Sequence, residues 1–77
     1  MKTLTLYTTA GCHLCEEAEL ILRYCQQYEP GIQWQSVDIA EDPALVERYG
    51  LRIPVIRKDD AELGWPFDPG QVMGFWK

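Results

Sequence analysis

The order of the periodic segments predicts an α/β fold built on a central, mixed, four-stranded sheet. An alternating apolar and polar run is followed by a run of helical periodicity and then by a second extended run. Two strands joined by a helix must run parallel, with a right-handed crossover. The second half is divided by prolines and ends in a short hairpin, which adds antiparallel strands. A chain of 77 residues has room for one core, so residues 1–77 are expected to form a single domain.

The first strand and the first helix are predicted over residues 2–7 and 12–28. Leu4 and Leu6 alternate with threonines, which is the period-2 pattern of a strand. A Pro-Gly pair at 30–31 ends the helix. Its apolar positions recur at helical spacing and are Leu14, Ala18, Ile21, Leu22, Cys25 and Tyr28.

A second strand and a second helix follow over residues 32–39 and 44–49. Asp42-Pro43 supplies an N-cap and a proline at the first helical position. Gly50 is expected to end this helix.

The segments PVIRK and ELGW are predicted to pair as a hairpin around Asp59-Asp60. A closing helix after Asp68-Pro69 has a weaker signal, because Gly70 and Gly74 each cost about 1 kcal/mol relative to Ala in a helix. The expected order is therefore β-α-β-α-β-β, followed by an α-helix that the sequence leaves open.

Composition and charge argue against several classes of partner. The formal net charge is −5, and the basic residues are scattered singly except for Arg57-Lys58, so no stripe is expected to neutralise phosphates. No apolar run approaches the roughly 20 residues that span a bilayer. An odd number of cysteines, two close together and one alone, is unlike a secreted disulfide framework. We therefore expect a cytoplasmic monomer that binds neither nucleic acid nor membrane.

The motif TAGCHLCEEA places two cysteines where a strand gives way to a helix. A cysteine at a helix N-terminus meets unpaired backbone N–H groups and the positive end of the helix dipole, which favour the thiolate. The dipole is worth about 0.3 to 1 kcal/mol, so it lowers a thiol pKa by less than about one unit. Cys12 is the expected nucleophile. Cys15 lies almost one turn on, deeper in the helix, and is the expected resolving thiol.

For the other residues near this motif that could carry chemistry, a structural role also stays open. His13 is expected to be solvated and to influence the thiol, with a role as general base or metal ligand as the alternative. Cys25 is about 20 Å along the helix from Cys12, so it cannot pair with the motif and is expected in the core. No metal site is expected, since a fourth ligand is missing. Simple packing of both motif cysteines also stays open.

Three segments carry a resemblance to a known family: LYTTAGCHLCEEA, VDIAEDPALVERYGLRIPVI and ELGW, in that order. Together they resemble the thioredoxin fold and, more closely, the small bacterial glutaredoxin-like proteins, over roughly residues 3–65. The resemblance implies a thiol-disulfide oxidoreductase with Cys12 and Cys15 as the redox pair. Its rivals are a thioredoxin-fold binding module without turnover and a small metal-binding domain.

The resemblance also implies a substrate groove and its partners. Pro54 is expected to be cis and to face the redox pair, while the backbone of Ile53 is left to pair with an extended substrate segment. His13 and Leu14 would line the same groove. The expected substrates are disulfide-containing proteins or small thiol compounds, with a thioredoxin-type reductant as a further partner. No resident cofactor is implied, and glutathione is a candidate co-substrate.

Overall fold

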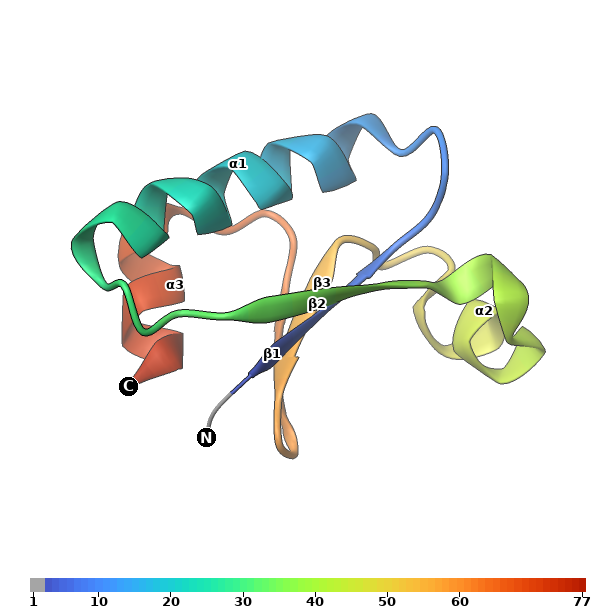
Figure 1. Ribbon diagram of the computed structural model, residues 1–77. Coiled ribbons are helices and arrows are strands. Elements are labelled where there is room, and N and C mark those ends of the chain that lie inside the picture. The colour runs from blue at the N-terminus through green and yellow to red at the C-terminus, as the bar shows by residue number, and fades with distance from the viewer. Residues whose placement is uncertain (1–2) are drawn as a thin grey trace.

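The protein forms a four-stranded sheet with two helices on one face and a third helix against the other (Figure 1). The structure is a computed structural model, and it describes residues 3–77. The elements are β1 (Leu4–Thr8), α1 (His13–Tyr28), β2 (Trp34–Asp38), the 3-10 turn η1 (Ile39–Glu41), α2 (Pro43–Tyr49), β3 (Val55–Lys58), β4 (Ala61–Gly64) and α3 (Pro69–Trp76).

The sheet has the order β2-β1-β3-β4. β1 runs parallel to β2 and antiparallel to β3, and β3 runs antiparallel to β4. The predicted α/β class, the mixed four-stranded sheet and the hairpin around Asp59-Asp60 are thereby confirmed. Because β1 and β3 are antiparallel neighbours, the loop that follows β1 and the loop that precedes β3 meet at the same end of the sheet.

One face of the sheet carries the larger apolar core, beneath α1 and α3. Fully burying a leucine or isoleucine side chain stabilises a fold by roughly 1.5 to 3 kcal/mol, so this layer supplies much of the driving force. The buried members of the layer are Leu4, Leu6, Ala18, Leu22, Cys25, Ile32, Ile56, Phe67 and Val72.

The opposite face has a smaller core beneath α2. Successive strand residues point to opposite sides of a sheet, so Tyr7 and Val55 lie on the face away from α1. They pack against Tyr49 of α2 and Ile39 of η1. The Tyr7 and Tyr49 rings are stacked, with their centroids 4.3 Å apart.

The closing helix α3 forms despite its two glycines, because both of its ends are satisfied. Asp68 accepts from the Gln71 N–H (2.8 Å), and the Gln71 side chain accepts from the Asp68 N–H (2.9 Å), which makes a capping box. At the other end, Lys58 Nζ donates to the Phe75 carbonyl (2.6 Å). A cation at a helix C-terminus also interacts favourably with the dipole. The sequence indicates the Asp68-Pro69 cap, but it does not show that Gln71 and Lys58 complete the two ends of the helix.

Two predicted core positions of the first helix are wrong. Leu14 is 43% exposed and Tyr28 is 66% exposed, since they lie at the two ends of α1, beyond the elements that cover its middle. The other four predicted positions are buried or packed against the core. The second strand is shorter than its predicted range of 32–39, and Lys2 of the first predicted strand lies outside the described residues.

Gly50 ends α2 by a different means from the one expected. Its φ of −50° and ψ of −35° are right-handed, so it is not the left-handed cap that glycine often provides. A Cβ at this position would lie 2.5 Å from the Val46 carbonyl oxygen. The glycine is therefore required by close backbone approach. Within residues 3–77, no helix is long and apolar enough to cross a membrane.

Candidate functional site

Cys12 and Cys15 form a disulfide at the first turn of α1, with their Cα atoms 5.2 Å apart. Gly11 precedes them with a φ of +75°, a conformation that side chains with a Cβ rarely adopt. Cys12 is the N-cap residue, and its Sγ accepts from the Cys15 N–H at 3.1 Å. The local sequence thus turns the chain sharply and places a sulfur atom where the helix has unpaired N–H groups.

The two cysteines differ in accessibility. Cys12 is half-buried, whereas Cys15 is only 3% exposed. An incoming sulfur atom would therefore meet Cys12 first. On reduction, the Cys15 N–H is placed to donate to a Cys12 thiolate, and hydrogen bonding to the charged form favours it.

The two residues between the cysteines lie in solvent. The His13 side chain is 84% exposed, and its Nδ1 is 3.8 Å from a carboxylate oxygen of Glu16, which is itself 79% exposed. Leu14 presents an apolar side chain beside the disulfide. This exposure fits the expectation of a solvated His13 and leaves both side chains accessible to a bound partner.

Ile53 and Pro54 lie at the same end of the sheet as the disulfide. Val55, the residue after Pro54, pairs with Tyr7 near the end of β1, and the loop to Cys12 begins two residues later. The Ile53–Pro54 peptide bond is cis, and Pro54 is buried.

The Ile53 backbone is less free than expected. Its N–H donates to the Tyr49 carbonyl at 3.0 Å. The expected pairing of Ile53 with a substrate segment therefore has to use its carbonyl oxygen. The cause is the tight turn after α2, in which the Arg52 N–H also donates to the Tyr49 carbonyl (2.8 Å).

The segment after β4 lies beside the Ile53–Pro54 loop. The Trp65 N–H donates to the Pro54 carbonyl at 3.0 Å, and the Trp65–Pro66 peptide bond is also cis. The Trp65 ring packs edge-on against Phe67, with the centroids 5.1 Å apart. The sequence signal for this turn is the Trp-Pro step directly after a strand, because cis peptide bonds occur almost only before proline.

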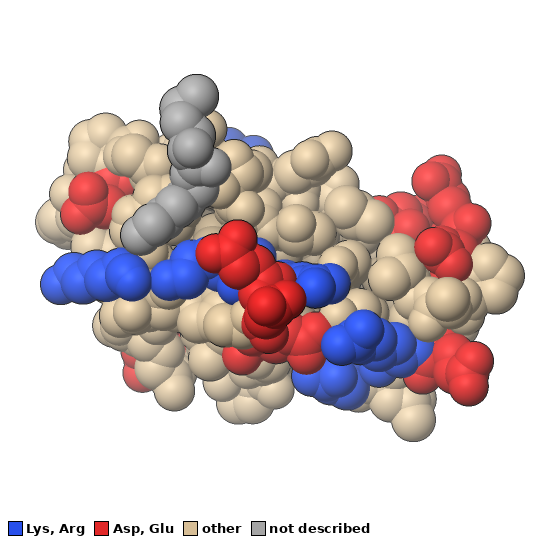
Figure 2. All heavy atoms as spheres, turned by 90° about the horizontal axis from the view of Figure 1, so that it is seen from below, with Lys and Arg blue, Asp and Glu red and all other residues tan. Residues whose placement is uncertain are grey.

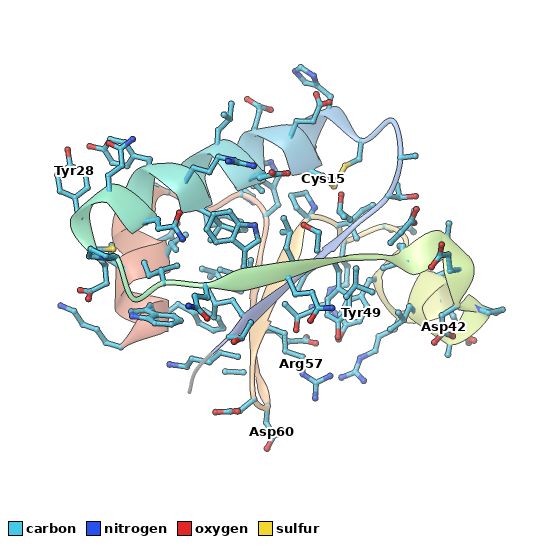
Figure 3. The ribbon with its side chains drawn as sticks, in the orientation of Figure 1. Cys15, Tyr28, Asp42, Tyr49, Arg57 and Asp60 are labelled. Carbon is cyan, nitrogen blue, oxygen red and sulfur yellow. A yellow bond between two sulfur atoms is a disulfide. The ribbon has the colours of Figure 1, made fainter. Side chains whose placement is uncertain are left out.

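A charged cluster borders the Ile53–Pro54 loop on the α2 side. The Tyr49 hydroxyl donates to Glu62 of β4, and Arg48 and Arg52 approach the same carboxylate at 3.8 and 3.2 Å. The Tyr49 hydroxyl, followed by the two arginines, holds the Glu62 pKa below its usual value, against the opposing effect of burial. Burial and the Glu62 carboxylate raise the Tyr49 pKa. In Figure 3, Tyr49 and Arg57 lie on the side of the sheet away from α1.

Cys25 lies outside this site, as predicted. It is a free cysteine, 1% exposed, whose Sγ is 3.6 Å from the Pro69 carbonyl oxygen. Burial raises its pKa, which keeps the thiol neutral. Within the described part of the chain, no group of three or more His, Cys, Asp or Glu side chains is arranged to hold a metal ion.

Known proteins match both the sequence and the fold. The model of a glutaredoxin-like domain (DUF836) matches residues 3–74. The crystal structure of the structural-genomics target protein XcR50 from X. campestris is 39% identical, with a TM-score of 0.84, covering 95% of this chain and 93% of that one. Protein Ne2328 from Nitrosomonas europaea is 31% identical, with a TM-score of 0.81, covering 97% and 89%.

A more distant match concerns the fold alone. The solution structure of reduced desulfothioredoxin from Desulfovibrio vulgaris Hildenborough is 18% identical, with a TM-score of 0.70, covering 97% of this chain and 78% of that one. This chain therefore has the thioredoxin fold, as its sequence resemblance implied.

Proposed function

Because the chain belongs to the glutaredoxin-like domain family, we propose that it is a thiol-disulfide oxidoreductase whose redox pair is Cys12 and Cys15. The observation that carries the proposal is the asymmetry of the pair at the start of α1. Cys12 caps the helix and is half-buried, and Cys15 is buried one turn further on. A redox pair needs one sulfur atom that meets the substrate and a second that is shielded until the mixed disulfide forms.

The proposed reaction begins with the reduced protein. The Cys12 thiolate attacks one sulfur of a target disulfide, so that the target S–S bond breaks, a mixed disulfide forms, and the departing sulfur leaves as a thiolate that takes up a proton. Cys15 loses its proton and attacks Cys12 Sγ, which releases the second target thiol. Two electrons have then passed to the target, and the Cys12–Cys15 disulfide remains.

A thiol reductant must restore the protein. We propose a dithiol protein of the thioredoxin type or glutathione in this role, and a cytoplasmic location, where such reductants are abundant. The chain's own residues would bind and orient the substrate: Leu14 lies between the two cysteines in the sequence, and Ile53 and Trp65 flank Pro54. His13 adds an exposed imidazole between the two cysteines.

Trapping the mixed disulfide tests the proposed roles. The reduced Cys15→Ser variant, mixed with a disulfide-bonded peptide, should accumulate a covalent adduct that dithiothreitol removes, and its turnover should fall to the background rate. The Cys12→Ser variant should form no adduct, and the wild type should gain a Cys12–Cys15 disulfide. Intact mass measures all three. If Cys15→Ser forms no adduct, the protein is a binding module without turnover and the proposal fails.

A further inference from the structure

The fold gathers basic side chains that are scattered in the sequence. Viewed from the side away from α1, Lys and Arg side chains form a band across the molecule, with Asp and Glu near its middle (Figure 2). Arg48 comes from α2 and Arg52 from the turn before β3, and both approach Glu62 of β4. Arg57 of β3 lies opposite Glu62 in the strand register. This local positive charge contrasts with the net charge of −5.

The charges at Glu62 do not balance. Two guanidinium groups share one carboxylate, which also accepts from the Tyr49 hydroxyl. The side chains of Arg48 and Arg52 are 62% and 50% exposed, so their remaining N–H donors face solvent. One carboxylate cannot neutralise two arginines, and a surplus positive charge is left for an anionic partner.

An exposed leucine lies between these two arginines in the chain. Leu51 is 104% exposed, which leaves its whole side chain in water. The turn that carries it is fixed, because the backbone N–H groups of Arg52 and Ile53 both donate to the carbonyl of buried Tyr49. The backbone on either side of Leu51 is therefore ordered before a partner binds, which reduces the ordering entropy that binding costs. Arginine, which flanks Leu51 here, is among the residue types that contribute most at protein interfaces.

This turn leads directly to the redox site, since Ile53 and Pro54 follow Leu51 and Arg52. We propose that Arg48, Leu51 and Arg52 form a docking site for a protein substrate, and that they bind a segment carrying Asp or Glu beside a large apolar residue, close to the target disulfide. The inference rests on the proposed function and names its substrate class. Charge complementarity selects the acidic residues, and the bare Leu51 side chain selects the apolar one. Glutathione offers carboxylates but no apolar side chain to cover Leu51.

Synthetic peptides with one intramolecular disulfide test the docking site. They differ only in the tripeptide beside it: Glu-Leu-Glu, Lys-Leu-Lys or Glu-Ser-Glu. The pre-reduced protein should reduce the Glu-Leu-Glu peptide about tenfold faster than the Lys-Leu-Lys peptide at about 0.01 M salt, and the gap should close at about 1 M salt. The rate is read by single-turnover kinetics.

Matched variants locate the effect. Arg48→Gln combined with Arg52→Gln should remove the preference for Glu-Leu-Glu over Lys-Leu-Lys, whereas Arg23→Gln on α1 should keep it. Leu51→Ser should remove the preference for Glu-Leu-Glu over Glu-Ser-Glu. Equal rates for all three peptides with the wild-type protein overturn the inference even if no variant folds, and so does a preference that survives the double substitution.

Bis(2-hydroxyethyl) disulfide separates the two proposals. The wild type and every folded docking variant should reduce this small neutral disulfide at the same rate. Reduction of the small disulfide together with equal peptide rates overturns docking alone. Failure to reduce any disulfide overturns the proposed function, and docking with it.

Discussion

The face of the sheet beneath α1 and α3 is packed almost entirely with hydrocarbon side chains. On the opposite face, a stacked tyrosine pair and a carboxylate bound by several side chains connect α2 to the sheet. On the first face, Leu22 and Val72 are fully buried and make apolar contacts. On the second, buried Tyr49 stacks on Tyr7 and donates to Glu62. The disulfide, which follows β1, and the Ile53–Pro54 loop, which precedes β3, lie at the same end of the sheet.

The difference indicates that the two layers have different roles: the first supplies stability, and the second positions the turn before β3. The apolar layer is non-directional and supplies stability in proportion to the area it buries. The α2 layer depends on hydrogen bonds of fixed geometry, and these hold the turn that presents Leu51, Arg52 and Ile53. We therefore expect substitutions in the first layer to cost the most free energy, and those in the second to change pH dependence and partner preference.

The largest effect on stability is expected in the apolar layer. Leu22→Ala should lower the free energy of unfolding by about 2 to 5 kcal/mol, because it leaves a cavity between α1 and the sheet. Leu20→Ala is the matched control: the same substitution in the same helix at a residue that is 66% exposed, where about 0.5 kcal/mol or less is expected. Urea denaturation followed by circular dichroism measures both. Equal losses at the two positions would contradict the apolar layer described above.

The sequence was sufficient to predict most of the first layer and the position of the Cys12–Cys15 pair. Periodicity identified Ala18, Leu22 and Cys25 as buried, and the change from extended to helical pattern placed Cys12 at the cap. Both signals are local, since each depends on spacing within one element. They fail where a helix extends beyond the elements that cover it, as at Leu14 and Tyr28.

The α2 layer and its contribution to the site could not be predicted in the same way. Glu62 lies 13 residues from Tyr49 along the chain, and nothing in either local pattern pairs them. The approach of Arg48 and Arg52 to Glu62 could not be predicted for the same reason, since the two arginines stand apart from Glu62 in the sequence. Sheet register is the missing information, because it decides which side chains share a face.

A smaller effect, with a distinctive pH dependence, is expected in the α2 layer. Tyr49→Phe should cost about 1 to 2 kcal/mol, since it removes a hydrogen bond to a carboxylate but keeps the stacked ring. The folded state lowers the Glu62 pKa, so this stabilisation is fully present above the ordinary value of 4.5 and is lost as pH falls through the lowered value. Tyr49→Phe removes the largest cause of that lowering. The variant should therefore lose stability less steeply on acidification.

Denaturation at a series of pH values from neutral to acidic checks this expectation. Tyr28→Phe is the control, because Tyr28 is 66% exposed and the loss of its hydroxyl should change little. An acid limb that is as steep in Tyr49→Phe as in the wild type would mean that the arginines alone set the Glu62 pKa.

The smallest effect on stability is expected at Cys25, the free cysteine of the apolar layer. Cys25→Ala should cost about 1 kcal/mol through a small cavity and leave the Cys12–Cys15 reaction unchanged. Because Cys25 Sγ contacts the Pro69 carbonyl at the start of α3, hydrogen exchange should show the loss mainly in that helix. Turnover of a disulfide peptide by the variant is the second measurement. If turnover were lost while stability stayed the same, Cys25 would belong to the redox chemistry. The division between a reactive first turn and an inert middle of α1 would then be wrong.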